Sequence, residues 1–141
     1  FQGERLVAAI AGMAASQLLW DDAFQYANER SAFGKPLSKL QVWRHQLVQL
    51  LTEMEAGKWL TYRCVDLFNR KVPCVKEVSM AKLYVAELAN KVADRCLQLH
   101  GGWGYIEDFH VARAWRDIRL LSIGGGTSEI MREIIAKTVG L

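Results

Sequence analysis

The stretch VSMAKLYVAELANKVADRCLQLHGG, residues 78–102, contains the pattern that decides the fold. Apolar side chains recur along it at steps of three and four residues, at Val78, Ala81, Val85, Leu88, Val92, Cys96 and Leu99. That spacing puts them on one face of a long amphipathic helix. Two glycines follow His100 and predict the end of the helix, because glycine readily adopts the backbone conformation of a C-cap.

Two earlier stretches show the same spacing and predict two more long helices. The first runs through Leu6, Ile10, Met13, Gln17, Trp20, Phe24 and Ala27, and the second through Trp43, Leu47, Leu50, Met54, Gly57, Thr61, Cys64 and Phe68. Gly34 and Pro36 break the pattern between them, and Pro73 separates the second from the third.

The C-terminal part of the chain predicts two shorter helices, from Val111 to Leu121 and from Ser128 to Val139. No segment alternates between apolar and polar residues over a useful length, which argues against β-strands. We therefore predict an all-α fold, an up-down-up-down four-helix bundle whose fourth helix is split.

Composition narrows the classes of function. The 141 residues suit one domain, and a net charge of +3 without a Lys/Arg block argues against nucleic-acid binding. No apolar run approaches the ~20 residues of a membrane span. Three scattered cysteines and three distant histidines offer no metal-ligand spacing, so we expect reduced thiols and no metal site. Because the chain begins with Phe1, we expect it to be part of a longer protein.

Five tryptophans are more aromatic bulk than one small core needs, so we expect some of them to face another domain or subunit.

The segment SIGGGTSEIMREII, residues 122–135, reads as a tight glycine turn that leads into the last helix. Thr127 or Ser128 suits the N-cap, and Glu129 complements the positive end of the helix dipole. Free N–H groups at such a turn attract anionic ligand groups. Yet the three glycines, Gly124 to Gly126, carry no side chain that could perform chemistry.

Three motifs in this order resemble the C-terminal helical domain of the acyl-CoA dehydrogenases. They are YANERSAFGKPL (26–37), LQLHGGWGY (97–105) and RDIRLLSIGGGTSEIMREIIAK (116–137), and the resemblance extends from Phe1 to Leu141. It implies that an N-terminal helical domain and a middle β domain precede this one in the complete enzyme. It also implies an FAD enzyme that converts an acyl-CoA to a trans-2-enoyl-CoA and passes electrons to an electron-transfer flavoprotein. Such enzymes are dimers or tetramers, in the bacterial cytoplasm or the mitochondrial matrix.

The resemblance also suggests where the catalytic base lies. Many members of the family carry a glutamate in the glycine turn, at the position of Gly125. The long-chain and isovaleryl types instead carry it near the start of the first helix, directly before an arginine, and this chain has Glu4 before Arg5. The resemblance thus implies Glu4 as the base, with the Gly125 backbone N–H helping to polarise the thioester carbonyl. An acidic residue here also simply complements a helix N-terminus.

The resemblance implies further roles by position. Phe1, Arg5 and Gly124 would contact the acyl-CoA. Residues expected to contact FAD fall into three groups: Arg30 at the pyrophosphate, with Phe33 and Gln41 beside the flavin; Gln98, Gly101 and Gly102 at the FAD of an adjacent subunit; and Thr127 and Glu129 near the adenine or pyrophosphate of the subunit's own FAD.

Two alternatives stay open. One is another flavoenzyme on the same fold, a nitroalkane oxidase or a flavin monooxygenase; Glu4 argues against the monooxygenase, which needs no base for an α-proton. The other is a catalytically silent helical module that serves only in assembly.

Overall fold

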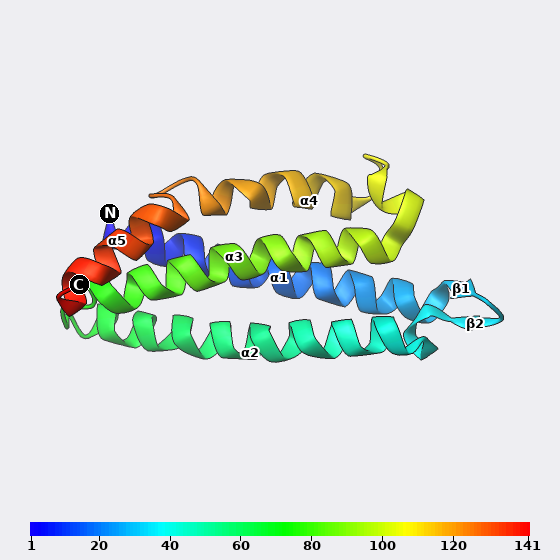
Figure 1. Ribbon diagram of the computed structural model, residues 1–141, viewed down its shortest axis with the longest axis horizontal. Helices are drawn as coiled ribbons and strands as arrows, with labels where there is room; N and C mark the ends of the chain where they lie inside the picture. The colour runs from blue at the N-terminus through cyan, green and yellow to red at the C-terminus, as the bar shows by residue number, and fades with distance from the viewer.

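The computed structural model describes residues 1–141 as an elongated helical bundle (Figure 1). Its α-helices are α1 (Gln2–Glu29), α2 (Gln41–Asn69), α3 (Val75–His100), α4 (His110–Ile118) and α5 (Ser128–Val139). Short 3-10 helices lie in the connections between them: η1 (Leu37–Lys39) before α2, η2 (Gly101–Tyr105) before α4 and η3 (Arg119–Ser122) before α5. The predicted all-α class and all predicted helices are confirmed.

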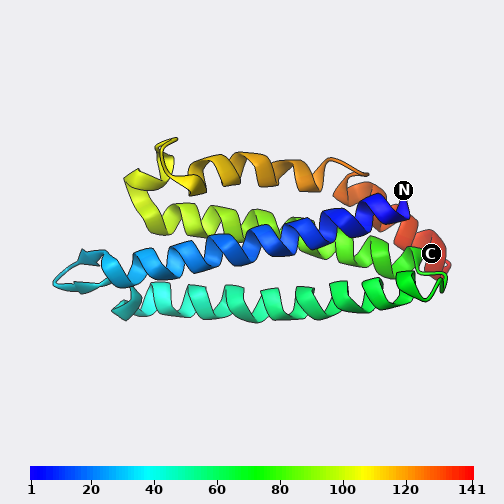
Figure 2. The ribbon, with the colours of Figure 1, turned by 180° about the vertical axis from the view of Figure 1, so that it is seen from behind.

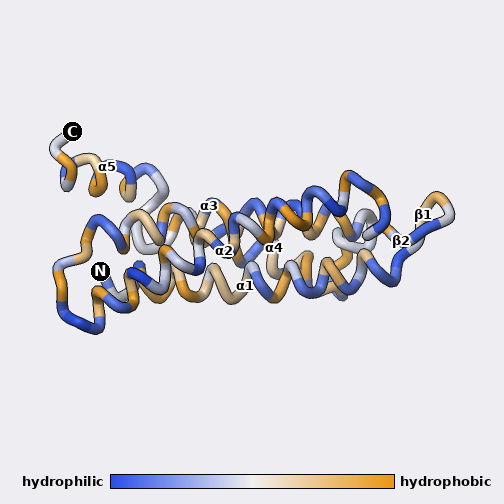
Figure 3. The backbone as a smooth tube through the Cα atoms, turned by 90° about the horizontal axis from the view of Figure 1, so that it is seen from below, coloured by the Kyte–Doolittle hydropathy of each residue, from blue (hydrophilic) through white to orange (hydrophobic).

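The first four helices run alternately up and down, as predicted. Helix α3 lies beside α1, α2 and α4, and views from both sides show the same order (Figures 1 and 2). Helix α5 packs against α3 at the end of the bundle where the chain begins, and it stands out from the long axis there (Figure 3). The fourth position of the bundle is therefore occupied by α4 and η3, whereas α5, expected as the second half of a split fourth helix, packs against α3 at one end.

A small hairpin marks the opposite end of the bundle. Strands β1 (Ser31–Ala32) and β2 (Lys35–Pro36) pair antiparallel around a two-residue turn. Phe33 and Gly34 both have positive φ, 53° and 78°, as the primed hairpin turns require. The sequence pattern predicted the break in the helix here but not the hairpin, because two residues per strand are too few to show alternation.

The predicted core faces of α2 and α3 are largely confirmed, whereas that of α1 is confirmed at Leu6 and Ala27 but wrong in between. Ile10 and Phe24, which were expected in the core, are 45% and 47% exposed. Helix α1 instead buries mostly small residues, namely Leu6, Ala9, Gly12, Ser16, Leu19, Ala23 and Ala27. Small side chains let the backbones of α1 and α3 approach closely, so the larger apolar residues of α1 are left outside.

Tryptophan exposure matches the expectation of surplus aromatic surface. Trp59, Trp103 and Trp115 are 63%, 50% and 47% exposed. Trp20 is half-buried, and its Nε1 donates to the Leu47 carbonyl at 2.9 Å. That another chain or domain covers the exposed ones stays a prediction. None of the helices combines the length and apolar character that crossing a bilayer requires.

The packing around α1 predicts how two of its glycines respond to substitution. A Cβ at Gly12 would lie 2.8 Å from Val85 Cγ1, so Gly12→Leu overpacks the contact and should lower the free energy of unfolding by about 1–3 kcal/mol. At Gly3, the nearest atom is Phe68 Cζ at 3.8 Å, so Gly3→Ala should raise it by about 0.5–1 kcal/mol. Urea denaturation measures both. Equal stability of Gly12→Leu and the wild type would contradict the close packing.

Candidate active site

The two segments expected to carry the chemistry meet at one end of the bundle. Arg5 Nε, in the first turn of α1, donates to the Gly125 carbonyl at 3.1 Å, although the residues are 120 positions apart. Glu4 is exposed beside it, and none of the chain's ion pairs involves Glu4. The start of α1 is therefore tied to the glycine turn, and the Glu4 carboxylate is left without a charged partner.

The glycine turn has the conformation that its sequence suggested. Gly125 and Gly126 have φ of 69° and 105°, and the Gly124 N–H donates to the Leu120 carbonyl at 2.8 Å. A Cβ at Gly125 would meet nothing within 4 Å, so the turn is open on that side. No backbone hydrogen bond engages the N–H of Gly125, which leaves it available to a ligand.

A buried lysine forms a hydrogen bond to the glycine turn. Lys82 is 1% exposed on α3, and its ammonium donates to the Gly126 carbonyl. Burial, and to a lesser extent the charge of Arg5, lower the pKa of Lys82. The sequence pattern did not predict a buried Lys82, because the predicted core face of α3 contains Ala81 and Val85 and omits the lysine between them. Lys82 could have been noticed from its position one helical turn after the apolar Val78, which places it at the edge of that face.

Thr127 caps α5, as one of the two predicted options. Its Oγ1 accepts from the Ile130 N–H at 3.4 Å. The Glu129 carboxylate accepts hydrogen bonds from the Glu129 backbone N–H and from the Thr127 hydroxyl. These bonds hold the pKa of Glu129 below its usual range, and the charges of Arg132 and Arg119 lower it further. Both residues line a cleft of about 430 Å³ beside η3. Because a carboxylate held in its charged form repels phosphate, Glu129 suits a hydrogen-bond donor better than a pyrophosphate.

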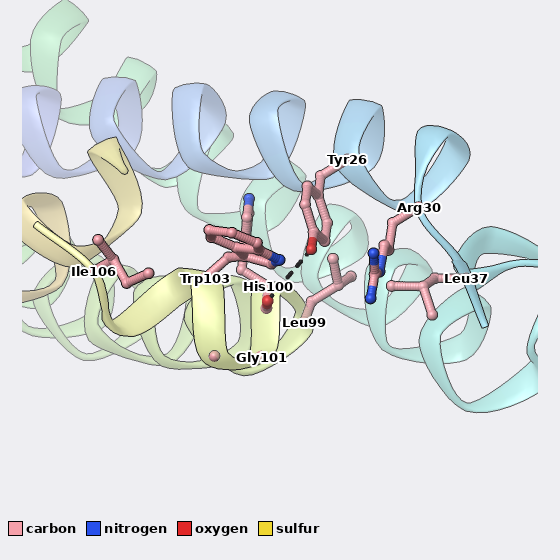
Figure 4. A pocket seen from close by; sticks show the side chains of 9 residues that line it. Tyr26, Arg30, Leu37, Leu99, His100, Gly101, Trp103 and Ile106 are labelled. Atoms are coloured by element: carbon pink, nitrogen blue, oxygen red, sulfur yellow. Dashed lines mark hydrogen bonds between the residues drawn. The ribbon is translucent and has the colours of Figure 1, made fainter. Parts of the chain in front are cut away.

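A second cavity lies at the other end of the bundle (Figure 4). It measures about 490 Å³ and is lined by Tyr26, Arg30, Leu37, Leu99, His100, Gly101, Gly102, Trp103 and Ile106. Tyr26 stacks on His100 with ring centroids 4.3 Å apart, and its hydroxyl donates to the His100 carbonyl at 3.5 Å. The cavity therefore lies between the C-terminal end of α1 and the glycine loop that follows α3.

The donors in this cavity fit a phosphate-bearing cofactor. Arg30 is the exposed C-cap of α1, and none of the chain's ion pairs involves it. A Cβ at Gly101 or Gly102 would meet nothing within 4 Å, so a ligand can approach the backbone closely. Sequence reasoning did not identify Tyr26, His100 and Trp103 as lining residues, although the three lie within the quoted motifs.

The remaining expected cofactor residues lie around this end without lining the cavity. Phe33 is 93% exposed at the tip of the hairpin, Gln41 is the exposed first residue of α2, and Gln98 is exposed in the last turn of α3. At the other end, Phe1 is exposed ahead of α1 and Gly124 is half-buried in the turn.

The expected site residues thus form two groups that the structure does not bring together. The catalytic group consists of Phe1, Glu4, Arg5, Gly124, Gly125, Thr127 and Glu129, and the Arg30 group consists of Arg30, Phe33, Gln41, Gln98, Gly101 and Gly102. Nearly the whole 28-residue length of α1 separates them. At ~1.5 Å per residue, that is on the order of 40 Å.

No group of three or more His, Cys, Asp and Glu side chains is placed to hold a metal ion. The three cysteines are buried free thiols, and burial raises the pKa of Cys64 to about 11 and that of Cys96 to about 12. Thiols whose pKa is raised in this way are poor nucleophiles, because little of the reactive thiolate forms.

Comparison with known proteins gives consistent matches. A family model described as "Acyl-CoA dehydrogenase, C-terminal domain" matches residues 1–140. The mitochondrial long-chain specific acyl-CoA dehydrogenase of Sus scrofa is 39% identical over 136 residues, which make up 96% of this chain and 32% of that protein. The CarC subunit of the caffeyl-CoA reductase-Etf complex of Acetobacterium woodii is 36% identical over 132 residues, 94% of this chain and 35% of that protein.

Among solved structures, an acyl-CoA dehydrogenase from Geobacillus kaustophilus superimposes with a TM-score of 0.98 at 40% identity. The match covers 99% of this chain and 37% of that one. The chain therefore spans about a third of the length of the relatives that it matches.

Proposed function

Since this chain belongs to the acyl-CoA dehydrogenase family, as its C-terminal domain, we propose that it works within a longer FAD-dependent oxidoreductase acting on acyl-CoA thioesters. An N-terminal helical domain and a middle β domain would complete that enzyme. The observation that carries the proposal is the bond from Arg5 to the Gly125 carbonyl. It ties the first turn of α1, which carries Glu4, to the open glycine turn whose Gly125 N–H is free, and so supports a shared role for the two segments.

In this proposal the catalytic group performs the proton chemistry. The Glu4 carboxylate removes the α-proton of the acyl-CoA, and the electron pair of that C–H bond forms the Cα–Cβ double bond. The Gly125 N–H stabilises the negative charge that develops on the thioester oxygen. FAD, when bound, would accept the β-hydrogen as a hydride. Other domains must cover Glu4 and exclude water, because the carboxylate is exposed in the isolated chain.

The distance between the two groups of residues supports a shared flavin site. One FAD cannot contact both ends of a bundle separated by a helix of about 40 Å. We therefore propose a homo-oligomer in which the Arg30 group of one copy completes the flavin site at the catalytic group of another. Thr127 and Glu129 would serve the chain's own FAD, with Glu129 on the adenine side.

The names of the relatives support both directions of the reaction. They include dehydrogenases as well as a caffeyl-CoA reductase and a 3-(aryl)acrylate reductase. A carboxylate that removes the α-proton in one direction returns it in the other, so the same residues serve both. We propose dehydrogenation to the trans-2-enoyl-CoA, with an electron-transfer flavoprotein as electron acceptor.

Glu4→Gln tests the base. In the complete enzyme this variant should keep FAD and bind acyl-CoA, because the amide preserves the shape of the side chain. Flavin reduction by acyl-CoA should slow by about 10²–10⁴-fold, the usual effect of losing a general base. Stopped-flow absorbance measures it, and Glu133→Gln on the exposed face of α5 is the control. A change of only a few-fold would place the base elsewhere.

A second variant moves the carboxylate. Glu4→Gly combined with Gly125→Glu should recover part of the activity lost in Glu4→Gln, because a side chain at position 125 points into open space. The positive φ of that residue should limit the recovery.

Arg30→Ala tests the cofactor role of the second cavity. A charge-assisted bond to phosphate contributes ~1.5–3 kcal/mol, so FAD affinity should fall by at least tenfold with little change in melting temperature. Arg70→Ala is a matched control, because Arg70 is the exposed C-cap of α2 and pairs only with Asp66. If Arg30→Ala instead lowers the melting temperature and leaves the flavin content unchanged, Arg30 has a structural role alone.

A further inference from the structure

Lys82 is a buried charge without a counter-ion. It is 1% exposed, none of the chain's ion pairs includes it, and its one hydrogen-bond partner is the Gly126 carbonyl. An ammonium removed from water without a carboxylate partner destabilises the fold, and an apolar side chain of similar volume would be more favourable at such a position. Its presence calls for a role other than stability.

The bonds around the glycine turn suggest that role. Three peptide groups are anchored: the Gly124 N–H donates to Leu120, the Gly125 carbonyl accepts from Arg5, and the Gly126 carbonyl accepts from Lys82. The peptide group between Gly124 and Gly125 has no such bond, and it carries the N–H proposed to bind substrate. The bonds on both sides hold the chain that flanks this peptide unit, and so they restrict the φ and ψ rotations that would turn its N–H away.

Flexibility of the turn makes the anchors necessary. Three consecutive glycines have wide conformational freedom, and ordering them costs more entropy than ordering other residues. Bonds from a cation to a carbonyl are stronger than neutral ones, so two cations from two different helices can hold the turn in a single conformation. Arg5 comes from α1 and Lys82 from α3, and these helices pack directly together.

We propose that Lys82 is a positioning residue: with Arg5 it fixes the glycine turn so that the Gly125 N–H points at the thioester oxygen of the substrate. This inference rests on the proposed function. Lys82 does not touch the substrate and takes no proton. Its effect passes through the orientation of one peptide group.

Lys82→Met in the complete enzyme separates positioning from stability. The methionine fills a similar volume without a charge, so the melting temperature should not fall. Flavin reduction by acyl-CoA should slow by roughly 10²-fold, the effect of a misplacement of about 1 Å, with little change in acyl-CoA affinity. Lys91→Met is the matched control, because Lys91 lies on the same helix and its bond to Glu53 is remote from the turn.

A spectroscopic measurement reports on the orientation directly. Infrared difference spectra of bound enoyl-CoA, labelled with ¹³C at the thioester carbonyl, give the carbonyl stretch, which falls when an N–H polarises the oxygen. The wild type and Lys91→Met should show the lowered frequency, and Lys82→Met should lose most of the shift. Lys82→Gln, which keeps a neutral donor, should lie between them.

The outcomes separate the two claims. A lowered frequency in the wild type that persists in Lys82→Met would overturn the positioning role and leave the proposed function standing. A drop in melting temperature that accounts for the lost activity, or failure of Lys82→Met and Lys82→Gln to fold, would assign the lysine to stability and overturn it as well. No lowered frequency in the wild type would refute the role of Gly125, and that of Lys82 with it.

Discussion

Close packing of α1 against α3 is the constraint on which the rest of the structure depends. Helix α1 presents a face of small residues, and a Cβ at Gly12 would already collide with Val85. The two helices therefore form a rigid rod with the catalytic group at one end and the Arg30 group at the other. The two groups are separated by nearly the whole length of the 28-residue helix α1, so side-chain movement cannot bring them together. A second copy of the chain is the simplest way to unite the two groups.

At the catalytic end, unfavourable features concentrate in a few residues. Gly125 and Gly126 have positive φ, and Lys82 is charged and buried without a carboxylate partner. Each departs from what stability alone would favour, and functional sites are where such departures are expected. We interpret them together: the cations hold the turn, and the turn leaves one N–H free at the end of the bundle that also carries the proposed base.

Much of the fold could be predicted from periodicity, and the failures have physical causes. The faces of α2 and α3 were predicted because their buried residues are apolar and regularly spaced. The face of α1 was assigned to large residues such as Ile10 and Phe24, whereas close packing selected Ala9, Gly12 and Ser16. Periodicity weighs hydrophobicity and cannot show that a neighbouring backbone comes too close for a large side chain.

The candidate site was likewise predicted only in part from the sequence. The family resemblance suggested Glu4, Gly125 and Arg30 as candidates, but not which residues share an end of the bundle. The contact from Arg5 to Gly125 spans 120 positions, and only the tertiary structure reveals it. Lys82 was missed because a lysine on a helix normally faces solvent, and nothing local in the sequence shows that it is buried against the glycine turn.

Mixed oligomers test the central claim, the sharing of one flavin site by two copies, most directly. Subunits with Arg30→Ala and subunits with Glu4→Gln are co-expressed, and the hybrid enzyme is isolated through two different affinity tags. In each hybrid pair, one site receives Glu4 from the first subunit and Arg30 from the second, so it has every wild-type group. The shared arrangement predicts dehydrogenase activity far above that of either variant alone. Activity no higher than the average of the two would contradict it.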